Sequence, residues 1–340
     1  MRISLGEAYQ ISLAALTRAG ATSLQAEPVA RSIQQAEAEG TRGIGLGYLQ
    51  WYCQHVKVGK IIGNAMPVIT HPRPATICVD AKGGFAHPAF EAGQTALIQA
   101  ATVQGIAILG ISNSYACGVL GYFSYRLAQA GLVSISFTNA SSTMAPWGGR
   151  MPFFGTNPWA FGAPRAGNAP LVIDSSSAAT AYVNLATAAA ENRTIPSHWA
   201  LDPNGNPTTD AALGLQGSIA PAGGHKGGAL ALMIEVLAAG LTGAHWSYQA
   251  SSLGDDIGGP PRLGQSFIAI DPSAMAPGFI TRLEQMLIAM GDQDGVRLPG
   301  ARRHANRAIF EATGVDLSDA ETALLSDLAG RSLHPLSSGQ

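Results

Sequence analysis

Apolar residues recur at every third or fourth position over the first forty residues of the chain. The stretches 5–20 and 23–40 both show this spacing, and each ends at a glycine, Gly20 and Gly40. Residues three and four apart share one face of a helix, and glycine commonly follows the last helical turn. The pattern predicts two amphipathic helices at the start of the chain.

Beyond residue 75, short apolar runs alternate with longer segments of helical spacing. Strands are predicted at 75–81, 105–112, 132–139, 170–177 and 265–271, and helices at 88–104, 118–130, an alanine-rich segment ending near 191, 225–242, 275–291 and 316–330. Strands that alternate with helices are typical of a sheet with crossover helices. The chain is therefore predicted to be an α/β protein.

The segment 140–168 is dense in Gly, Pro and Ser, yet it also holds two Trp and three Phe. A linker rarely carries so many aromatic side chains. We expect an ordered loop, a short strand and a turn that line a binding site.

Composition narrows the class of partner. The chain has 340 residues, 12% of them charged, and a formal net charge of −2. Such a balance does not favour nucleic acid or anionic lipid as partners, so a small-molecule substrate is expected.

Other features favour the cytoplasm. Cys53, Cys78 and Cys117 are an odd number without metal-ligand spacing, which predicts a reducing compartment. Glu7 interrupts any export signal, and Glu235 interrupts the most apolar run of the chain. That run is predicted to be a buried core helix rather than a membrane span.

Two glycine-rich stretches are candidates for phosphate binding. Residues 40–50, "GTRGIGLGYLQ", lack the third glycine of a dinucleotide fingerprint and follow a helix rather than a strand. In "GGHKGGALALM" (223–233), glycines flank His225 and Lys226 just before a long helix. Backbone N–H groups, the helix dipole and the lysine can converge there on one anion, unless the segment is only a capped turn with a solvated lysine.

Polar residues at two predicted strand ends allow two interpretations each. Asn113 and Ser114 follow one strand and open a helix, where they can cap the helix or contact a ligand. Asp174 ends another strand and can bind a ribose hydroxyl or cap the next helix. His87, His198 and His225 lie among turn residues near a possible pocket, whereas His55, His71, His245, His304 and His334 are expected to be surface or packing residues.

Five motifs together resemble one family. "MAPWGG", "GTNPWAFGAP", "LVIDSSS", "IPSHWALDPNGNPTTD" and "GGHKGGALALMIEVLAAGLTGA" occur in the order and spacing of the malate/L-lactate dehydrogenase family that lacks a Rossmann fold. Within that family the chain is most similar to the reductases of Δ1-piperideine-2-carboxylate and Δ1-pyrroline-2-carboxylate.

The resemblance implies a family-specific nicotinamide-binding mixed sheet with flanking helices and an N-terminal helical part. It implies residues 73–274 as the nicotinamide-binding domain, and residues 1–72, with the substrate loop, packing with C-terminal helices 275–335. It also implies a homodimer with the active site near the subunit interface.

The resemblance also assigns residues to the cofactor and the substrate. The cofactor-binding residues implied are Asn139, Asp174, Ser175, Ser176, His225, Lys226, Gly300 and Arg302. Thr156 and Asn157 are expected to border the nicotinamide and the substrate. NADP is expected, with NAD possible, because Arg302 and Arg303 can meet a 2′-phosphate.

The departures from the family pattern concern the catalytic positions. Relatives typically have Ser-His-Gly where this chain has Gly43-Ile44-Gly45, and an Arg where it has Tyr48. Relatives read Asn-Ser-His-His-Phe-Gly where it reads "NSYACG" (113–118). The expected acid/base imidazoles are therefore absent.

This absence favours one reaction over another. Hydride reduction of a ketone leaves an alkoxide that needs a proton from a positioned acid, whereas a protonated cyclic imine already carries its proton. We therefore expect a cyclic imino acid reductase that gives L-proline or L-pipecolate. Its catalytic candidates are Tyr115, Ser114, Tyr48 and His87, and its substrate-binding candidates are Arg42, Gly43, Ile44, Thr156 and Asn157.

Two alternatives remain. The chain can oxidise a 2-hydroxy acid such as malate, lactate or ureidoglycolate, with His87 or Tyr115 as a substitute base. It can also be an inactive member of the family that binds a nucleotide or metabolite.

Overall fold

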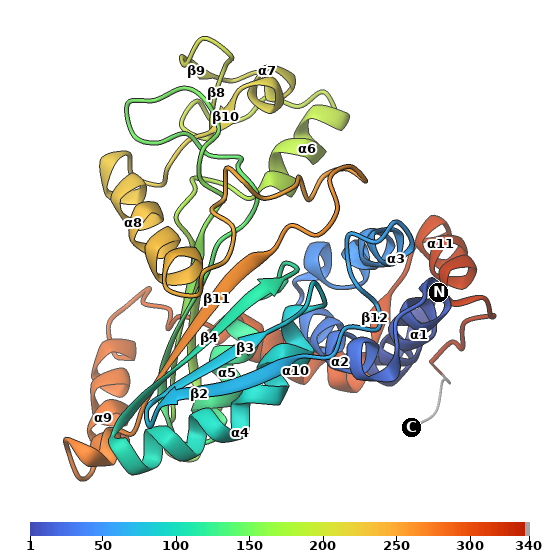
Figure 1. The fold of residues 1–340 in the computed structure, drawn as a ribbon. Coiled ribbons are helices and arrows are strands. Elements are labelled where there is room, and N and C mark those ends of the chain that lie inside the picture. Colours follow the sequence, from blue (N-terminus) through green and yellow to red (C-terminus); the bar gives the residue numbers. More distant parts are fainter. Residues whose placement is uncertain (337–340) are drawn as a thin grey trace.

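A seven-stranded mixed sheet forms the centre of the protein in this computed structural model, which describes residues 1–336. The strands follow the order β2-β3-β4-β11-β5-β6-β7 (Figure 1). Their bounds are β2 Val68–Arg73, β3 Thr76–Asp80, β4 Ile106–Ser114, β5 Val133–Thr138, β6 Pro158–Ala163, β7 Leu171–Ser176 and β11 Leu263–Ile270. The predicted α/β class with a mixed sheet is confirmed.

The sheet contains one parallel pair, β3 and β4, which α4 (Ala86–Gln104) connects as a crossover helix. The other neighbouring pairs of this sheet are antiparallel. Strand β11 comes from the last third of the chain and lies between β4 and β5. The strand-helix alternation predicted most elements of this sheet but not this insertion, because β11 pairs with strands about 130 to 160 residues earlier.

Helices cover both faces of the sheet. On one face, α4 and α5 (Gly121–Gln129) bury Phe90 and Phe123 against Phe267 of β11, with ring centroids 4.8 and 5.2 Å apart. On the other face lie α8 (His225–Glu235), the π-helical turn η3 (Val236–Gly240) and α9 (Phe279–Gly291). The sheet is therefore the middle of three layers.

The N-terminal helices form a second core beside the sheet. They are α1 (Leu5–Ala19), α2 (Ser23–Ala38) and α3 (Leu49–Lys57), and α11 (Asp319–Ala329) packs with them (Figure 1). Ser4 accepts a hydrogen bond from the Glu7 N–H at 3.0 Å and caps α1, which ends at Gly20 with a φ of 111°. Both predicted amphipathic helices are confirmed. Strands β1 (Arg2–Ile3) and β12 (Val315–Asp316) pair beside them.

Two other C-terminal helices differ in their packing. Helix α10 (Ala301–Thr313) contacts α2, whereas α9 packs against β6 and β7 through Leu287. The division of the chain at residues 72 and 274 stays a prediction.

A smaller lobe stands at one end of the sheet. It contains a three-stranded sheet of β8 (Ala200–Leu201), β9 (Pro207–Thr208) and β10 (Ser218–Ile219), with α6 (Tyr182–Ala190) and α7 (Ala211–Gln216) (Figure 1). Met144 and Phe154 from the aromatic segment are buried in its core. The segment 140–168 is ordered as expected, and its strand is β6.

The predicted buried helix at 225–242 needs a correction. Leu232, Met233 and Val236 are 54, 46 and 45% exposed, while Ile234 and Ala238 pack on the sheet. One face of this helix is therefore buried and the other is apolar but uncovered. Among the residues that the structure describes, no helix has both the length and the apolar character to cross a membrane.

Candidate active site

The loop after α2 is held in place by a buried carboxylate. Residues Arg42–Ile44 and Leu46–Tyr48 form two short 3₁₀ turns, and the Leu46 N–H donates to Glu37 Oε1 at 2.8 Å. A Cβ at Gly45 would lie 2.3 Å from the same oxygen, so only glycine allows this approach. Burial raises the pKa of the Glu37 carboxyl group. Gly45 therefore serves the attachment of the loop to α2.

The side chains of the loop point in different directions. Arg42 lies 3.3 Å from Glu37 Oε2 and 3.0 Å from Glu321 Oε1, so both neighbours of its guanidinium are protein carboxylates. Leu46 is 5% exposed and belongs to the N-terminal core. Gly43 and Ile44 are exposed. Gly47 is also exposed, whereas Gly45 and Leu46 are buried.

Two of the catalytic candidates are brought together. The hydroxyl oxygens of Tyr48 and Tyr115 are 3.4 Å apart, although the residues are 67 positions apart in sequence. His55 of α3 lies behind them, with Nδ1 2.6 Å from the Tyr115 hydroxyl oxygen. Burial raises the pKa of both phenols, so each hydroxyl keeps its proton at neutral pH. His55 is fully buried, as a packing residue would be, but its ring also bonds a candidate site residue.

Ser114, another catalytic candidate, is turned into the sheet. Its hydroxyl donates to Gln265 Oε1 at 2.6 Å and to the Leu263 carbonyl oxygen at 3.2 Å, both on β11. The side chain is fully buried. The structure therefore places Ser114 as a link between β4 and β11, away from the Tyr48–Tyr115 pair.

His87 lies at the first turn of α4 and faces α5. Its ring centroid is 5.2 Å from Phe123 and 5.9 Å from Tyr122, and the residue is 1% exposed. Within the described part of the chain, neither ring nitrogen has a hydrogen-bond partner. Burial and the nearby Arg126 lower the pKa of His87 to about 3. His87 is therefore a neutral ring among aromatic side chains, a poor position for a proton donor.

A buried carboxylate organises the expected nicotinamide region. Glu235 of α8 is 3% exposed and accepts hydrogen bonds from the Asn157 amide at 2.6 Å and from the Ser247 N–H and hydroxyl at 2.6 Å each. The Asn139 amide donates to the His245 carbonyl oxygen at 2.9 Å and lies 3.4 Å from the carboxylate. These two asparagines are thus held by the protein itself, and Glu235 positions them.

The serines after β7 bind the same region from the other side. The hydroxyl groups of Ser176 and Ser177 donate to the Thr156 carbonyl oxygen at 2.9 Å each. Ser175 is exposed at the edge of the sheet. Thr156 is therefore fixed through its backbone, and its side chain is half-buried.

The Asp174 carboxylate contacts the start of α5, an earlier helix, rather than the next helix α6. Its Oδ2 accepts the Gly121 N–H at 2.9 Å, at the start of α5, and lies 3.3 Å from Arg303. Gly300 precedes α10 with a φ of 79°, and a Cβ there would lie 2.9 Å from the Val172 carbonyl oxygen. Arg302 is exposed beside this turn. The strand end and the α10 turn therefore form one surface.

The start of α8 is exposed and positively charged. Gly223 and Gly224 have φ values of 62° and 68°, and His225 and Lys226 are exposed. A Cβ at Gly227 would lie 2.2 Å from the Ala222 carbonyl oxygen, so the turn depends on glycine. No side chain of the described residues caps this helix. Its first N–H groups and Lys226 form a donor set suited to a phosphate group.

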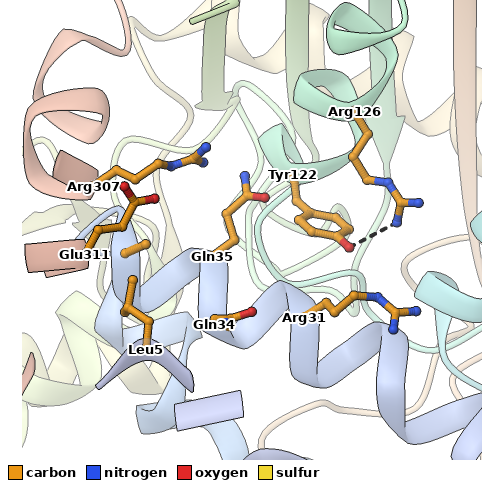
Figure 2. A pocket seen from close by; sticks show the side chains of 9 residues that line it. Leu5, Arg31, Gln34, Gln35, Tyr122, Arg126, Arg307 and Glu311 are labelled. Carbon is orange, nitrogen blue, oxygen red and sulfur yellow. Dashed lines mark hydrogen bonds between the residues drawn. The ribbon is translucent and has the colours of Figure 1, made fainter. Parts of the chain in front are cut away.

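A separate cavity of about 450 Å³ lies between α2, α5 and α10. Figure 2 shows the side chains that line it, among them Arg31, Gln35, Tyr122, Arg126 and Arg307. Arg31 and Arg126 pair with Glu91 at 2.8 and 2.7 Å, and Arg307 pairs with Glu39 at 2.6 Å. None of the expected site residues lines this cavity, so it does not belong to the candidate active site.

Sequence reasoning gave no role in the site to three buried residues that contact its candidate residues or loop: His55, Glu37 and Glu235. Their signal is weak, because a buried acid or imidazole looks like a surface residue in a single sequence. An acidic residue inside an apolar run, such as Glu235, is the clearest of the three signals, since an isolated buried charge is too costly to persist without partners.

Comparison with known proteins gives one consistent result. The family model described as malate/L-lactate dehydrogenase matches residues 3–326. A (2R)-3-sulfolactate dehydrogenase (NADP(+)) of Chromohalobacter salexigens is 43% identical over 90% of this chain and 91% of that protein. A Δ1-pyrroline-2-carboxylate reductase of Ancylobacter novellus is 38% identical over 97% of this chain and 98% of that protein.

The fold agrees with a solved structure of the same kind. The crystal structure of the Δ1-piperideine-2-carboxylate reductase from Pseudomonas syringae pvar. tomato matches with a TM-score of 0.92 at 34% identity. The match covers 96% of this chain and 99% of that one. The mixed sheet and its flanking helices are therefore those of a known architecture.

Proposed function

The chain belongs to the malate/L-lactate dehydrogenase family and is an oxidoreductase, and from this premise we propose that it reduces a cyclic imino acid. The substrate is Δ1-pyrroline-2-carboxylate or Δ1-piperideine-2-carboxylate, and the product is L-proline or L-pipecolate. The hydride comes from NADPH, with NADH as the other possible donor.

One observation carries this proposal: no acid with a pKa near 7 stands at the expected catalytic positions. Ile44 and Ala116 are aliphatic where the family resemblance implies histidines, and the Tyr115 phenol keeps its proton because burial raises its pKa. His55, which contacts Tyr115, and the candidate His87 are 0 and 1% exposed. A 2-oxo acid needs a proton donor as the alkoxide forms, but a protonated imine becomes a neutral amine on receiving hydride.

The nicotinamide cofactor supplies the hydride when bound. Lys226 and the first N–H groups of α8 would hold its phosphates, and the surface formed by Asp174, Gly300 and Arg302 would hold its adenosine end. Asn157 and Thr156, positioned by Glu235 and by the serines after β7, would border the nicotinamide and the substrate. Arg302 is exposed and free to meet a 2′-phosphate, which supports NADP over NAD.

Oxidation of a 2-hydroxy acid is the second candidate, because a relative at 43% identity is named a sulfolactate dehydrogenase. The two candidates differ in the bond that is reduced. The test follows nicotinamide absorbance with the purified protein, supplying Δ1-pyrroline-2-carboxylate, Δ1-piperideine-2-carboxylate, pyruvate, 2-ketoglutarate and 3-sulfopyruvate in turn. Turnover of the imines supports the proposal. Turnover of the oxo acids alone supports the second candidate. No turnover of any of these compounds indicates an inactive member of the family.

We also propose that the protein is a homodimer that uses the uncovered face of α8. Leu232, Met233, Val236 and Leu241 form an exposed apolar surface on this helix and the turn after it. Apolar surface of this kind commonly marks a protein interface. Light scattering should give twice the chain mass, and L232E with V236E should give a monomer. The matched control V103E, at a residue that is 77% exposed on α4, should leave the dimer intact.

A further inference from the structure

Three side chains from two separate parts of the sequence form a continuous hydrogen-bonded chain. It runs from Tyr48 in the loop before α3, through Tyr115 at the end of β4, to His55 in α3. The oxygen–oxygen distance between the tyrosines is 3.4 Å, and the Tyr115 oxygen lies 2.6 Å from His55 Nδ1. Tyr48 is half-buried, whereas Tyr115 and His55 are fully buried. This hydrogen-bonded chain therefore begins at the loop that carries substrate-binding candidates and ends in the interior of the protein.

The far end of this chain fixes the direction of its hydrogen bonds. His55 Nε2 lies 3.1 Å from the backbone carbonyl oxygen of Asp255, which can only accept. In the neutral ring Nε2 therefore carries the proton and Nδ1 accepts one from the Tyr115 hydroxyl. The Tyr115 oxygen then accepts from the Tyr48 hydroxyl, and the lone pairs of Tyr48 remain for a partner outside the chain. The resting chain is an acceptor at its outer end.

The surroundings keep His55 neutral at rest, and nearby acidic groups offset part of the cost of protonating it. Burial lowers the pKa of His55, and the buried ammonium of Lys60 lowers it further. Three contributions act in the opposite direction: the hydrogen bond to the Asp255 carbonyl, the Asp256 carboxylate, whose Oδ1 lies 3.8 Å from Nε2, and the Asp255 carboxylate. Trp51, on the same helix, adds an aromatic ring 5.8 Å away.

We propose that Tyr48, Tyr115 and His55 form a proton-accepting relay that takes the place of the missing imidazoles, with Tyr48 contacting the substrate nitrogen and His55 as the terminal base. The inference rests on the proposed function. In the reductive direction, the Tyr48 oxygen accepts a hydrogen bond from the iminium N–H and orients it, and no proton needs to be given.

The relay moves a proton in the oxidative direction. A cyclic amino acid at neutral pH carries two protons on its nitrogen and must lose one before a hydride can leave. That proton passes to the Tyr48 oxygen, the Tyr48 proton passes to Tyr115, and the Tyr115 proton passes to His55 Nδ1. The carbon–hydrogen bond breaks with its electron pair going to the oxidised nicotinamide, and the products are the iminium and an imidazolium beside Asp256.

The kinetic test compares H55Q, Y115F and the double variant with the wild type in L-proline oxidation across pH. Wild-type kcat should fall at low pH, because protonated His55 can no longer accept a proton. Each single variant should have a kcat roughly 100-fold lower, and this fall at low pH should disappear. The double variant should lose no more than Y115F alone, because both changes cut one relay. Losses below threefold with an unchanged pH profile, or losses that add, would overturn the relay.

Matched controls separate the relay from general damage. H71Q changes an exposed histidine on β2, and Y9F changes a half-buried tyrosine on α1. Both should keep the wild-type pH profile, and Y115F should keep the ring packing against Tyr52 and Phe85. A melting temperature of Y115F close to that of the wild type, together with its kinetic loss, assigns the loss to the hydroxyl group.

A measurement that needs no turnover tests the direction of the hydrogen bonds from Tyr48 to His55. In the free protein labelled with ¹⁵N-histidine, the ring of His55 should show a protonated Nε2 and an unprotonated Nδ1, and Y115F should shift Nδ1. The opposite tautomer, or no response to Y115F, would contradict the inference. If the wild type turns over a 2-hydroxy acid instead of L-proline, the proposed function fails. The same variants in that oxidation then decide the relay separately.

Discussion

Replacing the buried carboxylate of Glu235 by the isosteric amide in E235Q should destabilise the protein strongly. The carboxylate accepts from the Ser247 N–H, the Ser247 hydroxyl and the Asn157 amide at 2.6 Å each. A glutamine offers one oxygen and one NH₂ group. The hydroxyl can rotate to accept, but the backbone N–H and the Asn157 amide cannot, and the amide is held by a second bond to the Ala231 carbonyl oxygen at 3.1 Å. One donor must therefore face the new NH₂ group.

The magnitude follows from these contacts. Losing one hydrogen bond to a charged acceptor costs about 1.5–3 kcal/mol, and leaving its buried donor unpaired costs about 1–3 kcal/mol more. A total near 4 kcal/mol is a large share of a typical free energy of unfolding. An unfolding entropy of about 2.1 cal/mol/K per residue amounts to about 0.7 kcal/mol/K for this chain, so the melting temperature should fall by about 6 °C.

The assay is thermal unfolding at one protein concentration and one scan rate, because a large protein can unfold irreversibly. E191Q is the control. Glu191 is exposed, and among residues 1–336 its one ion-pair partner is Arg193 on the surface, so this variant should melt within about 1 °C of the wild type. S247A combined with E235Q should cost less than the sum of the single variants, since both act on the same hydrogen bonds. An E235Q melting temperature equal to those of E191Q and the wild type would refute the reasoning.

Three further predictions concern the cofactor, the missing imidazoles and the buried histidine. K226A should raise the KM for NADPH about 10- to 100-fold, since it removes a charge-assisted contact, while K57A at an exposed lysine of α3 should not; an unchanged KM would reject this phosphate contact. I44H with A116H should raise imine turnover by no more than a few-fold, and a hundredfold gain would show that acid catalysis is needed. H87L should lose less stability on acidification than the wild type. The pKa of His87 is about 3 in the folded protein, below its value in the unfolded chain. The wild type therefore loses the stability that it has above about pH 6.5 as the pH falls toward 3, and H87L does not. Between pH 7 and 5 this difference is about 2 kcal/mol, measured as the shift in melting temperature, and equal shifts in the two proteins would contradict it.

The elements of the fold were largely predictable. Periodicity located both N-terminal helices, the crossover helix α4 and most strands of the main sheet, because each buries one apolar face and its sequence shows that face. Helix α10 and strand β2 were not predicted. Helix α10 has no buried residue and β2 is exposed along its length, so neither carries a strong apolar pattern.

The candidate site was predictable only in part. The sequence placed Tyr48 and Tyr115 as candidates, and the structure brings their hydroxyl groups together. It gave no sign that His55 stands behind Tyr115. Arg42 was expected to bind the substrate, yet the structure gives it Glu37 and Glu321 as partners. A buried carboxylate requires a partner, and a single sequence does not say which cation reaches it.

By itself, the sequence determined the α/β class, the family resemblance and the aliphatic residues at Ile44 and Ala116 that point away from ketone reduction. Only the tertiary structure decided the place of β11 within the sheet, the neutral aromatic surroundings of His87 and the chain from Tyr48 to His55. Local patterns record which residues are buried and in which element, because burial follows periodicity. Which polar groups meet inside the protein depends on contacts between distant segments, and the packing of the whole chain sets those contacts.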